Sequence, residues 1–187
     1  MSTFGTALVI DLAPGSEVSE IAAVLNARVA YPRAIELESG WTRVSAFMPD
    51  VGQLDLIKDM SVSAGTCRVA VAEDNDEFGA LWAVLSVRDG VVETVHRRYV
   101  LNADPTDPGE VEAALQDLDG VDPRAEDVAG PGAARAAADL FEVEQARMLE
   151  AELESTWAFE QIGVVGGPFP WWDALRLHWG GVGESLR

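Results

Sequence analysis

The sequence is poor in the residues that most often carry chemistry. Its 187 residues include one cysteine, two histidines and one lysine. The single cysteine, Cys67, excludes an internal disulfide and a zinc site built on several thiolates. Because no disulfide is needed, the cytoplasm is the expected compartment. The two histidines, His96 and His178, are fewer than most histidine-based metal centres use. We therefore expect neither a metal nor another cofactor.

Long hydrophobic runs and common enzyme motifs are also absent. No stretch approaches the roughly 18 apolar residues that a membrane-spanning helix needs. The first fifteen residues lack a basic region and contain only a short apolar run, which indicates a strand rather than a signal peptide. The nucleophile elbow, the phosphate-binding loop and the dinucleotide-binding glycine motif are all missing. The sequence thus points to none of these common enzyme classes.

Basic residues are scarce. The chain has 13 Lys and Arg against 32 Asp and Glu, a formal net charge of −19. Arginine replaces lysine almost throughout, which is typical of a GC-rich bacterial coding sequence, with a halophile as the alternative. Because phosphate contacts require Lys and Arg, nucleic acids and anionic membranes are disfavoured as partners. A basic protein remains compatible with this charge, although solubility alone also explains it.

The first predicted domain covers residues 1–103. Apolar runs and alternation predict strands over 4–12, 34–38, 41–48, 66–72, 78–88 and 91–101. Helical periodicity predicts helices over 18–29 and 51–60, and Asp50 is expected to cap the second of these with Gln53 as its reciprocal partner. The order βαββαβββ predicts an α+β fold, with a mainly antiparallel sheet of about six strands and two packed helices.

The second predicted domain covers residues 104–187, an acidic helical extension with an aromatic C-terminal arm, expected to pack on the first. Asp107 before a proline indicates a helix start, with Glu110 completing a capping box. Further helices are predicted over 132–141 and 143–162, either separate or continuous. Residues 104–160 contain sixteen acids and three arginines, a net charge of −13. The helical half therefore holds most of the negative charge.

An Asp-Gly pair at 89–90 predicts a two-residue hairpin turn, in which facing residues have numbers that sum to 179. Trp82 is then expected opposite Arg97, where the guanidinium could stack on the indole. His96 is expected opposite Ala83, on the same face as Leu81 and Leu85. Arg97 and Arg98 point to opposite faces.

His96 and Arg98 are the candidate residues of a small-molecule site. His96 is the only plausible general base in the sheet, Arg98 could bind a carboxylate or phosphate, and Cys67 is the one candidate nucleophile. The simpler interpretations are a hydrogen-bonded core histidine, arginines that neutralise the protein's own acids, and an inert buried cysteine. The acidic stretch 73–77 does not fit a calcium loop and is expected to be a solvated turn.

The candidate partner-binding residues lie in the helical half: Glu150, Glu154, Phe169, Trp171 and Trp172. Glu150, Glu152 and Glu154 are predicted to form a solvated acidic face beside a packed stripe of Leu149, Leu153 and Trp157. The aromatic arm could dock on a partner or a second subunit. The alternative is that it folds back over its own sheet.

The sequence leaves three functions open. The leading hypothesis is a cytoplasmic, non-enzymatic acidic binding protein, such as an immunity-like or inhibitor protein for a basic partner. The alternative is a small-molecule-binding protein or enzyme with its site around His96 and Arg98. The third is a homo-oligomer formed through the C-terminal arm. A closed, dry sheet face at His96 would favour surface binding, and an open polar cavity would favour a ligand.

Overall fold

The protein is a six-stranded antiparallel sheet with helices on both faces. The α+β fold and the antiparallel six-stranded sheet are as the sequence predicts. The computed structural model describes residues 5–16, 18–27, 32–75, 78–162 and 168–177. The strands are β1 (Gly5–Leu12), β2 (Arg33–Glu36), β3 (Thr42–Met48), β4 (Cys67–Asp74), β5 (Gly79–Arg88) and β6 (Val91–Leu101). The helices are α1 (Val18–Ala27), α2 (Leu54–Ala64), α3 (Pro108–Asp117), α4 (Pro131–Phe141), α5 (Gln145–Ile162) and α6 (Phe169–Ala174), with a short 3-10 turn at Pro123–Glu126.

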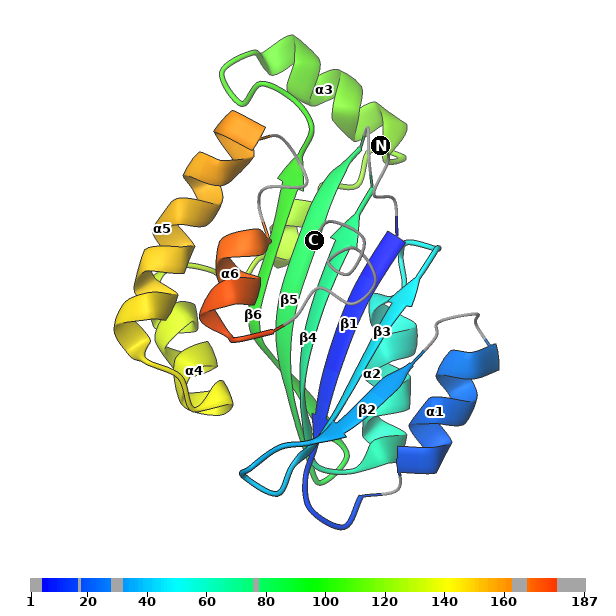
Figure 1. Ribbon diagram of the computed structural model, residues 1–187. Coiled ribbons are helices and arrows are strands. Elements are labelled where there is room, and N and C mark those ends of the chain that lie inside the picture. Colours follow the sequence, from blue (N-terminus) through cyan, green and yellow to red (C-terminus); the bar gives the residue numbers. More distant parts are fainter. Residues whose placement is uncertain (1–4, 17, 28–31, 76–77, 163–167, 178–187) are drawn as a thin grey trace, which may run out of the picture.

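The strand order across the sheet is β2-β3-β1-β4-β5-β6 (Figure 1). Every neighbouring pair is antiparallel, and β1 lies between β3 and β4. All eight residues of β1 and all eight of β4 are buried, because helices cover the sheet on both sides. This explains why these two strands have long apolar runs rather than strict alternation.

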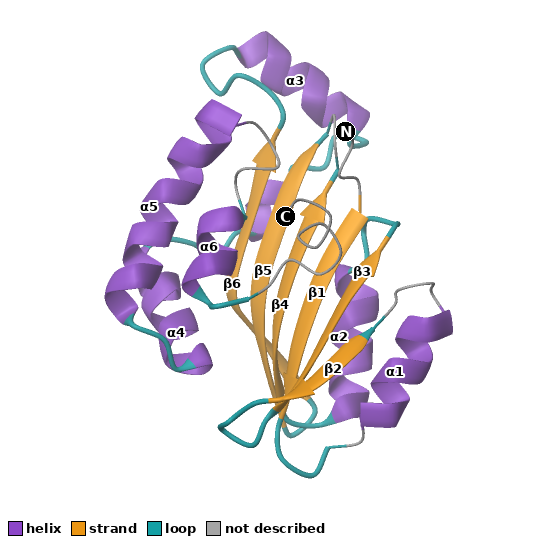
Figure 2. Cartoon of the chain, viewed as in Figure 1, coloured by secondary structure: helices purple, strands orange, loops and turns teal. Residues whose placement is uncertain are grey.

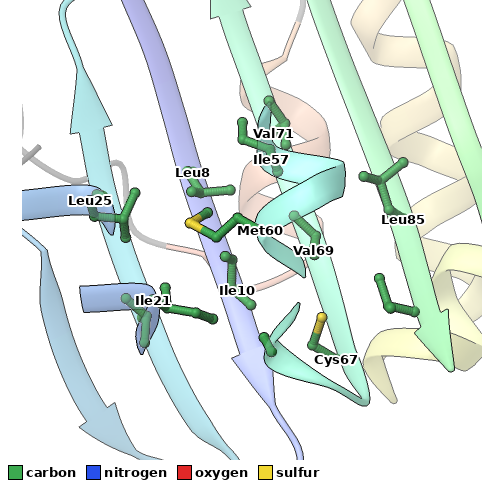
Figure 3. Packing of buried hydrophobic residues seen from close by; sticks show 14 of the residues in the cluster. Leu8, Ile10, Ile21, Leu25, Ile57, Met60, Cys67, Val69, Val71 and Leu85 are labelled. Atoms are coloured by element: carbon green, nitrogen blue, oxygen red, sulfur yellow. The ribbon is translucent and has the colours of Figure 1, made fainter. Parts of the chain in front are cut away.

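The first face of the sheet is covered by α1 and α2. Ile21 and Leu25 of α1 and Ile57 and Met60 of α2 pack against strand residues such as Leu8 (Figure 3). Their spacing of three to four residues follows the helical repeat, so one side of each helix faces the sheet. This is the core that the sequence predicts most directly.

The second face is covered by α4, α5 and α6 (Figure 2). Met148 and Ala151 of α5 are buried there with Trp82 of β5, whereas Leu153 is 76% exposed. The predicted stripe through Leu153 is therefore wrong, and its member Trp157 lies outside the side chains described. Helical spacing alone did not reveal which side of α5 faces the sheet, because the buried side also carries the acidic Glu152.

Helices α4 and α5 are separate. Glu142 ends α4 in the left-handed conformation, with φ of 57°, so the chain turns before α5 begins. Among the helices that the structure describes, none is long and apolar enough to cross a membrane.

Helix α3 packs at one end of the sheet, against Leu81, Tyr99 and Leu101. Its predicted cap is confirmed, since the Asp107 carboxylate accepts hydrogen bonds from the backbone N–H groups of Gly109 and Glu110 at 2.8 and 3.3 Å. The Glu110 carboxylate instead accepts from the N–H of Asp104 at 3.0 Å. This acid therefore orders the chain that leads into the helix.

The cap of α2 differs from the prediction. Asp50 does not cap this helix; the Glu73 carboxylate of β4 accepts from the backbone N–H groups of Gly52 and Gln53 at 3.2 and 2.8 Å. Glu73 and Asp74 are buried members of β4, so the expected solvated turn at 73–77 is also wrong there, and residues 76–77 lie outside the described residues. A strand carboxylate aimed at a helix N-terminus stabilises the partial positive charge there.

The β5–β6 hairpin follows the predicted register for its first four pairs, from Arg88–Val91 to Leu85–Thr94. A bulge then shifts the register by one residue, so that Val84 faces His96. The predicted Trp82–Arg97 pair is therefore wrong, and Trp82 faces Arg98. His96 consequently lies on the second face of the sheet, rather than on the face of Leu85. A bulge adds one residue to one strand, which a count from the turn cannot anticipate.

Candidate functional site

His96 lies in the middle of the second sheet face, between two indole rings. Its ring centroid is 3.7 Å from that of Trp171 and 6.5 Å from that of Trp82, with interplanar angles of 29° and 26°. The three side chains are 0%, 1% and 2% exposed, respectively for His96, Trp171 and Trp82. The imidazole is thus closed off from solvent by its stacking partners.

A carboxylate from α5 joins this stack. Glu152 Oε2 lies 3.3 Å from His96 Nε2, a close contact without the alignment of a hydrogen bond. The same oxygen accepts the indole N–H of Trp171 at 3.0 Å, and Oε1 accepts the backbone N–H of Gly130 at 2.6 Å. Arg98 Nη1 is 3.8 Å from Oε1. Glu152 therefore links the sheet, the start of α4 and helix α6.

We call Trp82, His96, Arg98, Glu152 and Trp171 the His96 cluster. Strand alternation places His96 and Arg98 on one side of β6, and the register brings Trp82 opposite Arg98, whose Cζ is 5.9 Å from the indole centroid. Glu152 faces inward because it lies one helical turn after the buried Met148, on the same side of α5. The predicted solvated position of Glu152 is therefore wrong. His96 and Arg98 lie on the same side of β6, as alternation along a strand requires.

The protonation of the cluster follows from its burial. Burial lowers the pKa of His96 below its ordinary value; the neighbouring Glu152 carboxylate opposes this shift without overcoming it, and Arg98 adds to it. Burial alone would raise the pKa of Glu152, but its contacts with His96, Gly130 and Arg98 outweigh burial and lower it. At neutral pH the pair is therefore a neutral imidazole beside an ionised carboxylate.

A histidine held by a carboxylate is the arrangement of a general base. In this fold, however, the imidazole has no exposed surface, and Arg98, at 25% side-chain exposure, is the most accessible charged member of the cluster. The described arrangement therefore ties helices to the sheet without offering the imidazole to a substrate. His178, the other histidine, lies outside the described residues.

Cys67 and His96 are not brought together. Cys67 belongs to the core under α2, on the first face of the sheet, whereas His96 and its neighbours Trp82 and Trp171 lie on the second. Burial raises the pKa of the Cys67 thiol to about 11, although a hydrogen bond to Ser61 opposes the shift. A thiol that stays protonated is a poor nucleophile.

The candidate partner-binding residues divide into two groups. Glu150 and Glu154 are exposed on α5, and Phe169 is 41% exposed at the start of α6. Trp171 and Trp172 are buried against the sheet, at 1% and 4% exposure. These two indoles lie where the fold-back alternative would place them.

A second buried ionic cluster escaped the sequence analysis. The Asp11 carboxylate, with no exposed surface, accepts two hydrogen bonds from Arg43, at 2.6 and 2.8 Å, and one from Arg68 at 3.0 Å. Arg68 also donates to the carbonyl of Leu140 at 2.8 Å, which connects the sheet to the end of α4. The one available signal was an acid inside the apolar run of the first strand.

Residues 122–129 form a strap along part of the outer edge of β6. Val128 exchanges two backbone hydrogen bonds with Arg97, at 2.8 and 2.9 Å. The Asp127 carboxylate accepts from the Arg97 side chain and from the backbone N–H of Tyr99, both at 2.9 Å. The strap thus covers the half of β6 nearer to its C-terminal end.

An open groove of about 560 Å³ lies between α4 and the hairpin end of β5 and β6. On the α4 side, the small residues Gly132, Ala133 and Ala136 line it together with Asp139 and Leu140. Its charged residues are Arg88, Glu93 and Asp139. The lining residues are Ser86, Arg88, Glu93, Thr94, Val95, Val128, Ala129, Gly132, Ala133, Ala136, Asp139 and Leu140. The groove is separate from the buried His96 cluster.

Within the described ranges, no three His, Cys, Asp or Glu side chains gather in a way that could hold a metal ion. Comparison of the chain with protein-family models, with curated proteins and with solved structures found no match. The site has to be interpreted from its own geometry.

Proposed function

We propose that this is a non-enzymatic acidic binding protein, of the immunity-like or inhibitor kind, whose target is a basic protein. The observation that carries the proposal is the closure of the sheet face at His96. His96 is fully buried beneath Trp171 and beside Glu152. The residue that the sequence favours as a general base is therefore not accessible to a substrate from solvent. The charged surface of the helical half is then the most distinctive accessible feature.

The acids of this half are exposed while few cations balance them. Exposed acids run from the approach to α3 through α5: Asp104, Asp107, Glu110, Glu112, Asp117, Asp119, Glu126, Asp139, Glu142, Glu144, Glu150 and Glu154. Of the three arginines in residues 104–160, Arg124 pairs with Asp122 at 2.9 Å and Arg147 pairs with Asp173 at 3.1 Å. The surface field of this region therefore favours a positively charged partner.

The test is affinity capture with the full chain as bait, at low and then moderate salt, followed by identification and purification of the bound protein. We expect a basic protein that elutes as the salt rises, because screening weakens attraction between exposed charges. The double variant Glu150→Lys/Glu154→Lys should weaken its binding at least tenfold. A partner that is not basic, or binding that is insensitive to salt, would overturn the proposal.

The matched control is Glu36→Lys/Glu38→Lys. It changes the net charge by the same amount, at exposed positions near the far edge of the sheet. Equal losses in both double variants would mean that net charge alone attracts the partner and that α5 is not the contact surface.

The alternative function, a small-molecule-binding protein or enzyme around His96 and Arg98, retains one supporting observation. Four buried polar atoms on this side of the sheet have no hydrogen-bond partner among the described residues: Trp82 Nε1, His96 Nδ1, His96 Nε2 and Ser155 Oγ. Buried polar groups are normally paired. A metabolite screen by thermal shift tests this alternative, and a stabilising ligand whose effect is lost in Arg98→Met would favour it.

Self-association through the C-terminal arm is a further proposal. With Trp171 and Trp172 buried, Phe169 is the exposed aromatic residue of α6 that such a contact would use. Light scattering on the full chain and on Phe169→Ser tests it. A monomeric mass for the unmodified chain across the working concentration range would count against it.

A further inference from the structure

In the part of the chain that the structure describes, other segments protect only half of the outer edge of β6. Edge strands expose backbone groups that can pair with another chain, and proteins usually block them. The other edge strand, β2, has four residues, whereas β6 has eleven. The strap covers β6 at Arg97 and Tyr99. The segment from Val91 to Val95 has no such cover among the described residues.

The register shows which backbone groups of this segment point outward. Arg88 and Val91 flank the two-residue turn and form its hydrogen-bonded pair. Alternation from there directs the N–H and C=O groups of Val92 and Thr94 away from β5. The outward groups of Arg97, beyond the bulge, bond to the strap, which agrees with this alternation. Two consecutive outward positions of β6 are therefore open to a new strand.

The groove lies beside this open edge. Glu93, Thr94 and Val95 form one side, and the small residues of α4 form the other. Glu93 and Asp139 are exposed acids of the groove, and Asp139 is held by the neutral side-chain amide of Gln145 at 2.8 Å. Long basic side chains can lie over a wall of small residues with their charges near carboxylates. Arg88 gives the hairpin end the opposite charge.

We propose that an extended basic segment of the partner protein adds to the open edge of β6 as a seventh strand. Its backbone pairs with Val92 and Thr94, and its Lys or Arg side chains reach Glu93 and Asp139. Strand addition of this kind takes its affinity from main-chain hydrogen bonds and its specificity from alternate side chains. The inference rests on the proposed function, because the charge of the segment follows from the proposed basic partner.

The probe for this proposal is an end-capped synthetic octapeptide of alternating Lys and Val, titrated into the full-length protein at low salt. We expect saturable binding, with the largest amide NMR shifts at Val92 and Thr94. An octapeptide of alternating Glu and Val should not bind.

Two further peptides carry N-methyl groups on all Val amides or on all Lys amides. In an added strand, the backbone N–H groups of every second residue point toward β6. One methylated peptide should therefore lose at least tenfold in affinity, and the other should bind as tightly as the unmethylated octapeptide.

Protein variants test the same edge. Thr94→Pro removes one outward N–H and should weaken the octapeptide at least tenfold, whereas Thr94→Val keeps that N–H and should bind within twofold of the unmodified chain. Ala34→Pro, an equivalent outward position on the β2 edge, should also stay within twofold. If Thr94→Pro fails to fold, the methylated peptides still decide the question.

The outcomes separate this inference from the proposed function. If a basic partner is captured but the octapeptide does not bind, or both methylated peptides bind alike, strand addition is wrong and the proposed function stands. If the octapeptide causes NMR shifts on α5 instead of β6, strand addition is likewise wrong and the proposed function stands. If neither the octapeptide nor any basic protein binds, both proposals fail.

Discussion

The carboxylate of Glu152 accepts the indole N–H of Trp171 at 3.0 Å, in a region from which solvent is excluded. The bond joins α5 to α6, while the other oxygen of Glu152 holds the start of α4 through Gly130. Three helices of the second layer thus depend on one buried charge. Such a group is costly to bury, so its hydrogen bonds have to offset the loss of hydration.

We predict that Glu152→Ala destabilises the protein by about 3 kcal/mol, because it leaves the Trp171 and Gly130 donors buried without an acceptor. Urea unfolding followed by tryptophan fluorescence measures the change. Glu150→Ala, on the exposed side of the same helix, should stay within about 0.5 kcal/mol of the unmodified chain. Equal effects of the two substitutions would contradict the role of Glu152.

The buried histidine predicts a loss of stability on mild acidification. Since burial lowers the pKa of His96 in the folded state, the unfolded chain takes up its proton first as the pH falls below 6.5. Above that pH, His96 is neutral in both states and its titration does not change the free energy of unfolding. Below it, the free energy of unfolding falls by up to about 1.4 kcal/mol per pH unit. Glu152, with its lowered pKa, stabilises the fold above pH 4.5 and loses this contribution in more acidic solution.

Two other carboxyls act in the opposite direction. Burial raises the pKa of Glu73 and of Asp127, so their protonation on acidification favours the folded state.

The comparison with His96→Phe isolates the histidine, because phenylalanine keeps a ring between the two indoles and cannot titrate. Unfolding free energies at pH 7, 6 and 5 should fall more steeply for the unmodified chain than for the variant. Parallel curves would show that His96 does not titrate on unfolding.

Asp11 should be indispensable to the fold. Asp11→Ala removes the carboxylate that is hydrogen-bonded to the buried Arg68, at 4% exposure, and leaves Arg68 with a 3.8 Å contact to the exposed Glu142. We expect a loss of about 3–5 kcal/mol in guanidinium unfolding. The matched control is Asp55→Ala, which breaks an ion pair with Lys58 whose acid is 93% exposed. Exposed pairs contribute about 0–1 kcal/mol. A small effect at Asp11 would mean that solvent reaches the two arginines.

Cys67 should resist thiol reagents in the folded protein. Its pKa of about 11 and its burial leave on the order of one thiolate per thousand thiols at pH 8. We expect labelling by a chromogenic disulfide reagent to be at least a hundredfold slower in buffer than in 8 M urea. The denatured chain is the internal control. Rapid labelling in buffer would show that the edge of α2 opens readily.

The amino-acid sequence by itself determined the architecture of this protein. Apolar runs, the helical repeats of Ile21 and Ile57, and the Asp-Gly turn are local properties of the chain. They were sufficient to predict six strands, their antiparallel arrangement and the pairing next to the turn. The Asp107 cap was equally local, because a capping side chain bonds to residues two or three positions away.

The candidate site was decided by tertiary structure. One bulge in β6 moved His96 to the other face of the sheet, and packing selected the side of α5 that buries Glu152. Asp11 and Glu73 found partners 20 to 57 residues away in the chain. Such contacts depend on which faces meet once the layers assemble, and similar polar residues elsewhere in the chain remain at the surface. The partners of a buried charge are therefore set by the assembled fold, whereas the spacing of apolar residues already sets the elements that assemble.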